Sequence, residues 1–439
     1  MKKRIFTSLL IGTMMLGLVA CGKEGSTSEV EDKKITNIEE AYETEVPAYV
    51  TSGLIRPIFD EGDGSYQMCI QNTNREEFDA YASLLEKEGF SVHTKKEISA
   101  GSTANDKNVF YTYKGKGIHI LLSWYPNIGI SRIIMTPEEL LPSLEKPELE
   151  AEDTVTPSVT QMQLDGMGMM YVTQLADGKF IVIDGGVYGL DDMWRLHDYL
   201  IEKTPEGKKP TIACWMYTHP DPDHIGLATE FPAKYAEEIV LESVAYNFTS
   251  EKFTTTGNQD DNTLITAFKV LIKNIKEYYP DAVHYILHAG QSYYFKGLEI
   301  EILQTSEELY PNAANVWNDV SASWRMKFDN GQTVMFLGDS MQVLCKQLAK
   351  VYGDYLKSDM LQLAHHGLIG GDLELYKYID PDICFWSTTE ERFNGTYAGY
   401  DHKYCLGEGG CDYNGYLRDA SIKERTHYHN GMMGIVEIK

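Results

Sequence analysis

No two cysteines in this 439-residue sequence stand at the CxxC spacing. The seven cysteines are Cys21, Cys69, Cys214, Cys345, Cys384, Cys405 and Cys411. Structural zinc sites usually draw their thiolates from such close pairs, so the cysteine spacings match no CxxC metal pattern. Cys214 and Cys384 lie within apolar runs and are predicted to be buried free thiols. Cys405 and Cys411 flank a glycine-rich loop that a disulfide could close.

Positive charge is scarce, with 39 lysine and arginine residues against 65 aspartate and glutamate residues, a net charge of −26. No basic stripe is visible. Such a chain repels polyanions, so a nucleic-acid partner is disfavoured by the net charge. Because salt screens charges beyond about 10 Å, a local patch could still bind a single strand, and nucleic acid is not excluded.

Only one long apolar run is present, and at residues 5–18 it is too short to span a bilayer comfortably. It follows three basic residues, so residues 1–20 are predicted to be a secretory signal peptide. The segment ends in the letters LVAC, which resemble the bacterial lipoprotein box. We therefore expect lipidation at Cys21 and anchoring at the outer face of a bacterial cell membrane. Residues 21–44, rich in Glu, Lys, Ser and Thr, are expected to be a flexible tether.

Residues 45–137 are predicted to form a small α+β domain without a catalytic constellation. Residues 76–89 have helical apolar spacing, and strands are expected near residues 109–113, 117–125 and 131–135. The segment 138–157, rich in Glu and Pro, is predicted to be a linker.

From residue 158 to residue 439 the pattern changes to short apolar strands, glycine turns and intervening helices. The expected helices lie near residues 190–203, 260–279 and 341–352. The expected strands lie near residues 180–184, 211–217, 284–288, 299–303, 323–328, 333–337, 360–364, 383–387 and 433–438. Strands with helices between them indicate an α/β layered sandwich.

The strongest chemical signal is the loop THPDPDHIG at residues 218–226, directly after an apolar strand. His219, Asp221, Asp223 and His224 are four metal-ligating side chains within six residues. Imidazole and carboxylate together suit Zn²⁺, Mn²⁺ or Fe²⁺. A polar surface turn is the alternative.

Two later apolar strands also end in ligating side chains. Residues 333–339 (TVMFLGD) end in Asp339, which could bridge two cations. Residues 361–367 (LQLAHHG) end in His365 and His366 followed by glycine. Each of these two strand ends is a weak signal alone, because strands often end in polar residues. Together with the loop at residues 218–226, in this order along the chain, they form a strong signal.

This order resembles the metallo-β-lactamase superfamily, whose αββα sandwich carries an HxHxDH loop, then Gly-Asp and then His at strand ends. The resemblance covers residues 160–439. It is closest to the branch of the DNA-uptake protein ComEC and related secreted hydrolases, in which the loop reads HxDxDH. It implies an αββα metallo-β-lactamase sandwich preceded by the small α+β domain.

The resemblance implies a set of roles for residues of this chain. His219 and Asp221 would hold one cation, while Asp223, His224 and His365 would hold another, with Asp339 bridging. Asp184 would be structural, orienting the metal loop. His366 would contact a substrate oxygen or protonate a leaving group, or be a supporting histidine, and Asp223 could also orient the attacking water. One or two divalent metal ions, Zn or Mn, are expected, and the first site has few ligands because no further histidine matches.

The function implied is an extracytoplasmic metal-dependent hydrolase. It is expected to be a phosphodiesterase that uses a metal-bound hydroxide on a nucleic-acid or cell-envelope phosphoester. The alternative is a catalytically degenerate, envelope-binding lipoprotein. Residues 397–416, with five tyrosines, are expected to form a rim or lid over the site, or else a surface loop without a ligand role.

Overall fold

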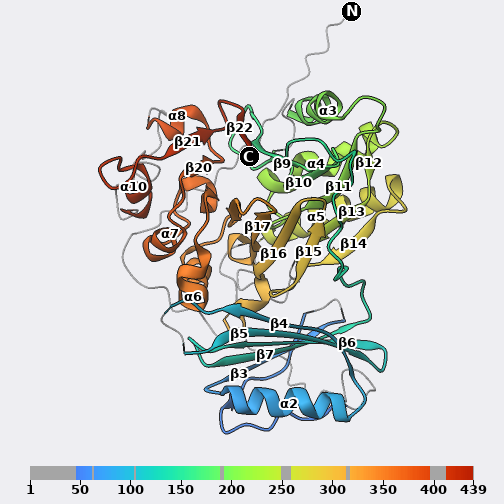
Figure 1. The fold of residues 1–439 in the computed structure, drawn as a ribbon, viewed down its shortest axis with the longest axis vertical. Coiled ribbons are helices and arrows are strands. Elements are labelled where there is room, and N and C mark those ends of the chain that lie inside the picture. Colours follow the sequence, from blue (N-terminus) through green and yellow to red (C-terminus); the bar gives the residue numbers. More distant parts are fainter. Residues whose placement is uncertain are drawn as a thin grey trace, which may run out of the picture.

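The computed structural model describes residues 46–61, 64–102, 105–187, 192–248, 259–312, 317–395 and 412–438. The predicted signal peptide, tether and Cys21 therefore lie outside the described residues. Three β-sheets organise this part of the chain (Figure 1). None of the described helices has the length and apolar character needed to cross a membrane.

The first sheet belongs to the N-terminal domain and has the strand order β1-β3-β7-β6-β5-β4, with β2 paired to β3. Its strands are β1 (Leu54–Ile55), β2 (Phe59–Asp60), β3 (Tyr66–Gln71), β4 (Ser91–Ser99), β5 (Lys107–Gly115), β6 (Ile118–Tyr125) and β7 (Ile130–Pro137). The strands β1 to β4 were not expected from the sequence. β4 is largely polar and exposed, whereas β3 is mostly buried.

Helix α2 (Arg75–Lys87) covers one face of this sheet (Figure 1). It begins where the Asn74 side chain accepts a hydrogen bond from the Glu77 backbone, which satisfies a free N–H of the first turn. Phe78, Tyr81 and Leu85 recur at helical spacing and are buried against the sheet, as the apolar pattern predicts.

The second sheet has the strand order β14-β13-β11-β10-β9-β8-β22, with β12 paired to β11. Its strands are β8 (Ser158–Gln161), β9 (Tyr171–Gln174), β10 (Phe180–Ile183), β11 (Thr211–Met216), β12 (Val240–Leu241), β13 (Ser243–Tyr246), β14 (Val283–Ile286) and β22 (Gly434–Glu437). The pairs β10–β11, β11–β13 and β13–β14 are parallel. Their carboxyl ends therefore meet at one edge of the sheet.

The third sheet has the strand order β15-β16-β17-β18-β19-β20-β21. Its strands are β15 (Ser292–Phe295), β16 (Leu298–Gln304), β17 (Ser323–Phe328), β18 (Thr333–Phe336), β19 (Met360–Gln362), β20 (Ile383–Trp386) and β21 (Thr426–His429). β18, β19, β20 and β21 are parallel neighbours. This sheet too brings several strand ends to one edge.

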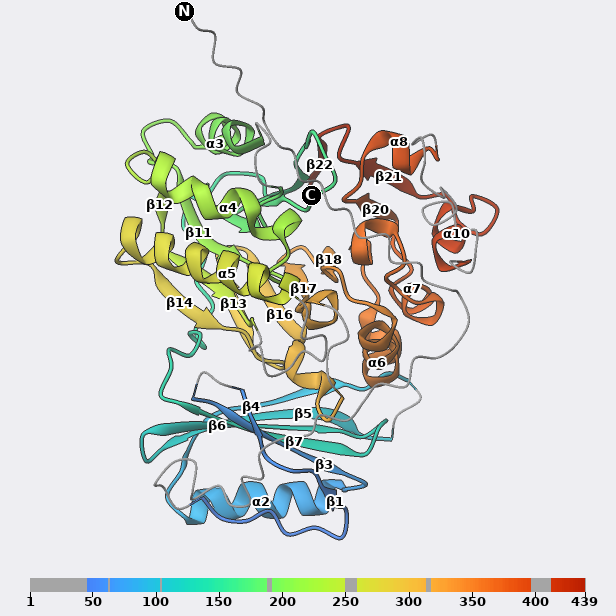
Figure 2. The ribbon, with the colours of Figure 1, turned by 180° about the vertical axis from the view of Figure 1, so that it is seen from behind.

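The second and third sheets pack face to face through one apolar cluster that includes Ile181, Met216, Trp324 and Phe336. Helices cover both outer faces, as Figure 2 shows. On the second sheet these are α3 (Asp192–Lys203), α4 (Pro222–Tyr235) and α5 (Gln259–Tyr278), and on the third sheet α6 (Gln342–Tyr352), α7 (Leu373–Ile379) and α10 (Asp412–Arg418). The predicted α/β class and its αββα layering are confirmed.

The N-terminal domain packs against the sandwich through its other sheet face (Figure 2). Tyr125 donates to the buried Glu308 carboxylate at 3.1 Å, and Arg132 donates to the Glu308 backbone carbonyl at 2.6 Å. The side chain of Asn108 donates to the Val351 carbonyl at 3.1 Å. These buried polar contacts fix the orientation of the domain, because each would be costly to leave unmade.

The segment between Pro137 and Ser158 contains no helix or strand. It is attached to the sandwich by Glu139, whose Oε1 lies 3.0 Å from His288 Nε2, while Glu307 lies 2.7 Å from His288 Nδ1. Burial alone would lower the pKa of His288, but Glu307 and Glu139 raise it well above the usual value. The imidazolium therefore links the segment to the body of the protein.

Replacing His288 by alanine is expected to lower the free energy of unfolding by about 3–5 kcal/mol at pH 7, because two carboxylates would face each other without their cation. Because the pKa of His288 is higher in the folded state, its contribution to the free energy of unfolding is complete when the pH is below the pKa of the unfolded state. That contribution is lost as the pH rises through the pKa of the folded state. The loss caused by His288→Ala, measured by urea denaturation, should therefore shrink at alkaline pH. His284→Ala on β14 is the control, since burial lowers the pKa of His284 and no such trend is expected. An equal loss for His288→Ala at every pH would contradict the ion-pair account.

Candidate metal centre

The predicted ligand residues meet where parallel strands of the two packed sheets end. Asp184 directly follows β10, and His219 lies three residues after β11. Asp339 lies three residues after β18, and His365 and His366 lie just beyond β19 in the short segment η5 (Ala364–Gly367), where both have non-helical backbone angles. Asp223 and His224 fall in the first turn of α4, with Pro222 at its first position. Apolar strands thus deliver polar residues to one edge of the sandwich.

Asp184 organises the metal loop from beneath and is completely buried. Its carboxylate accepts hydrogen bonds from the Thr218 backbone at 2.8 Å and the Thr218 hydroxyl at 2.7 Å. It also lies 2.7 Å from His224 Nδ1, which must donate because a carboxylate only accepts. The His224 ring is thereby fixed with Nε2 directed into the cluster.

Two more imidazoles are oriented in the same way. His366 Nδ1 lies 2.7 Å from the Ser387 carbonyl and donates to it. His219 Nδ1 lies 3.1 Å from the Thr218 hydroxyl, whose proton is already donated to Asp184. In both residues Nε2 is therefore the atom left to face the centre.

Carboxylate oxygens and imidazole nitrogens converge closely at the middle of the site. Asp339 Oδ1 lies 3.2 Å from His224 Nε2, and Asp339 Oδ2 lies 3.1 Å from His366 Nε2. The two imidazole Nε2 atoms are 3.3 Å apart. Asp223 Oδ2 lies 3.1 Å from His366 Nε2.

His219 and Asp221 form the other side of the cluster. His219 Nε2 lies 3.4 Å from Asp221 Oδ2 and 3.9 Å from Asp339 Oδ2. Two groups of three have ligand atoms within 4.8 Å of one another, namely His219, His224 and Asp339, and Asp223, His224 and His366. Asp339 also reaches His366 of the second group, a position suited to a bridging carboxylate.

The electrostatics of the cluster favour a cation. Burial alone would lower the pKa of His366, yet Asp339 and Asp223 raise it to about 10, and carboxylates likewise raise the pKa of His224 well above its usual value. The pKa values of Asp339 and Asp223 lie below the usual range, because the imidazolium groups outweigh burial. A divalent cation would have to displace these protons, so its affinity should fall as the pH falls.

The residues present fit one or two divalent metal ions. His219 Nε2 and Asp221 Oδ1 are buried and make no hydrogen bond within the described part of the chain. Unpaired buried polar atoms are costly unless something unseen satisfies them. Three imidazoles donate a hydrogen bond through Nδ1, which leaves Nε2 free to bind metal. Together with three carboxylates they are a suitable set of ligands for Zn²⁺, Mn²⁺ or Fe²⁺.

The geometry distinguishes the two adjacent histidines, His365 and His366. His365, predicted as a ligand, has Nε2 3.9 Å from Asp339 Oδ2, and its buried Nδ1 makes no hydrogen bond among the described residues. His366, predicted to touch substrate, is the residue oriented by a carbonyl and in contact with Asp339 and Asp223. Both have left-handed backbones, with φ of 49° and 58°, which costs on the order of 1–2 kcal/mol each. That conformation turns His366 into the cluster.

Histidine-to-alanine substitutions should separate the two residues. His366→Ala removes an oriented nitrogen and is expected to reduce metal affinity by more than about 100-fold, the upper cost of changing a group that only supports a ligand. His365→Ala should reduce it by less than about 10-fold. Isothermal titration with Zn²⁺ or Mn²⁺ measures both values. A larger loss for His365→Ala would restore the sequence-based assignment.

Sequence reasoning gave no role to Asn318, which lies in the 3-10 helix η3 (Trp317–Val320). Its side-chain Nδ2 donates to Asp339 Oδ2 at 3.2 Å and Asp221 Oδ2 at 3.4 Å. Asn318 begins the sequence NDVS at residues 318–321, just before β17, but its position in the sequence alone assigns it no contact. Residues 397–411 of the predicted rim, which include Cys405 and Cys411, lie outside the described residues.

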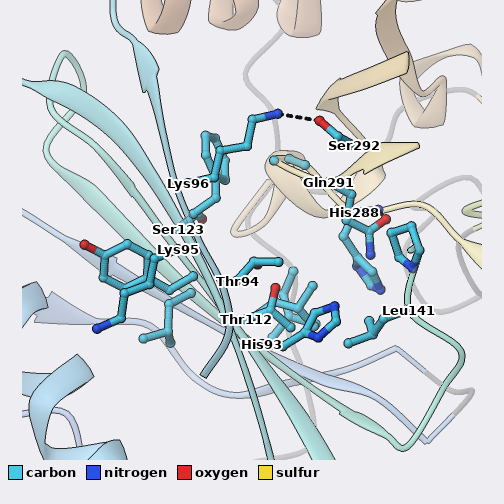
Figure 3. A pocket seen from close by; sticks show the side chains of 18 of the residues that line it. His93, Thr94, Lys95, Lys96, Thr112, Ser123, Leu141, His288, Gln291 and Ser292 are labelled. Carbon is cyan, nitrogen blue, oxygen red and sulfur yellow. Dashed lines mark hydrogen bonds between the residues drawn. The ribbon is translucent and has the colours of Figure 1, made fainter. Parts of the chain in front are cut away.

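A separate cavity of about 310 Å³ lies between the N-terminal domain and the sandwich (Figure 3). His93 and Thr112 come from the N-terminal sheet, Leu141 from the linking segment, and Gln291 from the sandwich. None of the clustered ligand residues lines it. The cavity is therefore not the candidate metal centre.

No protein-family model and no curated protein matches the chain. Similar solved structures include the metallo-β-lactamase fold protein YhfI from Bacillus subtilis, with 12% identity, a TM-score of 0.37 and coverage of 64% of this chain and 100% of that one. Zinc-bound PqqB from Methylobacterium extorquens has 9% identity, a TM-score of 0.35 and coverage of 63% and 99%. CmlA, a diiron β-hydroxylase from Streptomyces venezuelae, has 12% identity, a TM-score of 0.38 and coverage of 69% and 55%. The chain thus spans little more than half of the hydroxylase.

Proposed function

We propose that this protein is a metal-dependent hydrolase of the metallo-β-lactamase superfamily. The observation that carries the proposal is the convergence of His219, His224, His366, Asp223 and Asp339 at one strand edge, with three imidazole Nε2 atoms left to face the same space. His219, Asp221 and Asp339 would hold one cation, and Asp223, His224 and His366 the other, with Asp339 serving both. Bound there, a divalent cation would lower the pKa of a water molecule and offset negative charge that develops on a substrate oxygen.

The residues of the chain would position the reactants around that centre. Asp184 holds the His224 ring in one tautomer, and Thr218 links that carboxylate to His219. Asp223, whose side chain is one-quarter exposed, has an edge open to accept a hydrogen bond from an approaching water and so to orient it. His365 is partly exposed beside Asp339 and would contact a substrate oxygen or the leaving group.

Phosphodiesters are the substrate class that we propose. Three carboxylates among the ligands make the site harder than one built from histidines alone and favour Mn²⁺ beside Zn²⁺. The HxDxDH loop, which resembles the ComEC-like branch, points the same way. The net charge of −26 disfavours long nucleic acids and favours smaller or cell-envelope phosphoesters. The apparent signal peptide and lipoprotein box support a location at the outer face of a bacterial membrane, anchored at Cys21.

The alternative is an envelope-binding lipoprotein that has lost turnover. The small number of ligands on the His219 side favours it, because a degenerate centre would hold metal weakly. The intact orientation of His219, His224 and His366 favours the enzyme, since an unused site has no need for three fixed imidazoles.

The deciding experiment is metal analysis of the chain from residue 22, followed by hydrolysis of bis-p-nitrophenyl phosphate with added Mn²⁺ or Zn²⁺. Bound metal and turnover lost on chelation are expected. Hydrolysis of carboxylic esters or lactams without any phosphodiester hydrolysis would overturn the substrate class. Absence of both metal and turnover would favour the binding lipoprotein.

A further inference from the structure

The segment of residues 317–322 touches the candidate metal centre at three places. The Asn318 side chain donates to the carboxylates of Asp221 and Asp339. The Ser321 hydroxyl accepts from the Asp339 backbone N–H at 3.0 Å. The Ala322 backbone N–H donates to the Thr218 carbonyl at 3.0 Å, at the root of the metal loop. One short segment therefore contacts both the loop and the bridging carboxylate.

The other side of the same segment is packed against the N-terminal domain. Trp317 and Val320 belong to a buried apolar cluster with Phe59 and Cys69 of that domain. The Phe59 ring lies 5.3 Å from the ring of Tyr310, whose hydroxyl donates to the Pro57 carbonyl. Phe59 and Cys69 are completely buried, so this contact is a continuous part of the core.

We propose that the N-terminal domain supports the metal centre by fixing the segment 317–322, and that Asn318 is the positioning residue through which it acts. This inference rests on the proposed metal centre. The Asn318 amide has two N–H groups and no charge, so it can hold two carboxylates near each other that would otherwise repel. Packing at Trp317 sets where that amide lies, because close-packed interiors transmit small displacements.

The role of Asn318 predicts a defect in metal binding. Asn318→Ala is expected to weaken metal affinity about 10- to 100-fold, the usual cost of removing a group that orients ligands. Asn274→Ala is the matched control. The Asn274 side chain is likewise a hydrogen-bond donor, but it donates to the carbonyl of Thr229 at 2.8 Å, and Thr229 lies within α4 beyond the metal loop. Titration with Mn²⁺ or Zn²⁺ alone gives both affinities. Equal affinity for Asn318→Ala and unmodified protein would overturn the role of Asn318.

The role of the domain is tested without metal or substrate. Phe59→Leu and Phe78→Leu each replace a buried aromatic ring of the N-terminal domain, but Phe78 belongs to α2 and packs on the opposite face of the sheet. Hydrogen exchange of the Asp339 and Ala322 amides in metal-free protein should quicken several-fold more in Phe59→Leu, although both variants lose thermal stability. Equal exchange in the two variants would overturn the support role. If unmodified protein bound no metal, the proposed function would fail, while the exchange comparison would still decide whether the domain supports this segment.

Discussion

The Asp339→Asn variant is expected to lose tight metal binding and hydrolysis together, each by more than about 100-fold. Asp339 is 1% exposed, and its two oxygens lie 3.1–3.2 Å from the imidazoles of His366 and His224. It also lies within 3.9 Å of His219. Asparagine keeps the side-chain volume but removes the negative charge that lies beside His219, His224 and His366. The loss of metal affinity should therefore be electrostatic in origin.

This substitution is informative because the fold should survive it. Asp339 is held at its backbone by Ser321, a contact that asparagine retains. Thermal melting should therefore remain cooperative, measured by circular dichroism beside metal titration. Asp329→Asn, at the exposed ion pair with Lys146, is the isosteric control and should change neither property. Full turnover by metal-loaded Asp339→Asn protein would rule out a bridging role for this carboxylate.

The Asp184→Asn variant is expected to show a double defect, in stability and in metal affinity. Asp184 accepts three hydrogen bonds in a fully buried site, from the Thr218 backbone, the Thr218 hydroxyl and His224. An asparagine amide would turn an N–H group toward one of these donors. Removing the charged partner of a buried imidazole costs about 3–5 kcal/mol in the free energy of unfolding. Metal affinity should fall about 10- to 100-fold, because the His224 ring would lose its orientation.

Two measurements separate these consequences. Urea denaturation of metal-free protein reports the stability loss, and metal titration well below the midpoint reports the affinity loss. The matched control is Asp359→Asn, since Asp359 also accepts from a threonine backbone and hydroxyl, those of Thr333, but at the far end of β18. It should lower stability without changing metal affinity. Unchanged metal affinity in Asp184→Asn would contradict the orienting role.

Much of the architecture could be predicted from the sequence because apolar runs and their ends are local signals. The helix at residues 75–87 and the strands at residues 180–183, 211–216 and 333–336 lie within a few residues of their expected bounds. Several strands were missed, both short buried ones such as β9 and β13 and the polar strand β4. β4 is exposed along most of its length and pairs only at the sheet edge, so its sequence lacks the alternation that marks a half-buried strand.

The order of apolar strands and polar residues along the chain was enough to predict which side chains could form the centre and that they would meet, because each follows an apolar strand and parallel strands end together. It did not determine which of His365 and His366 points inward. That depends on two consecutive left-handed residues and on the Ser387 carbonyl, which follows β20 and is distant in the chain. The contacts of Asn318 and the shared apolar cluster of Phe59 and Trp317 likewise depend on the tertiary structure, since they join segments that no local pattern relates.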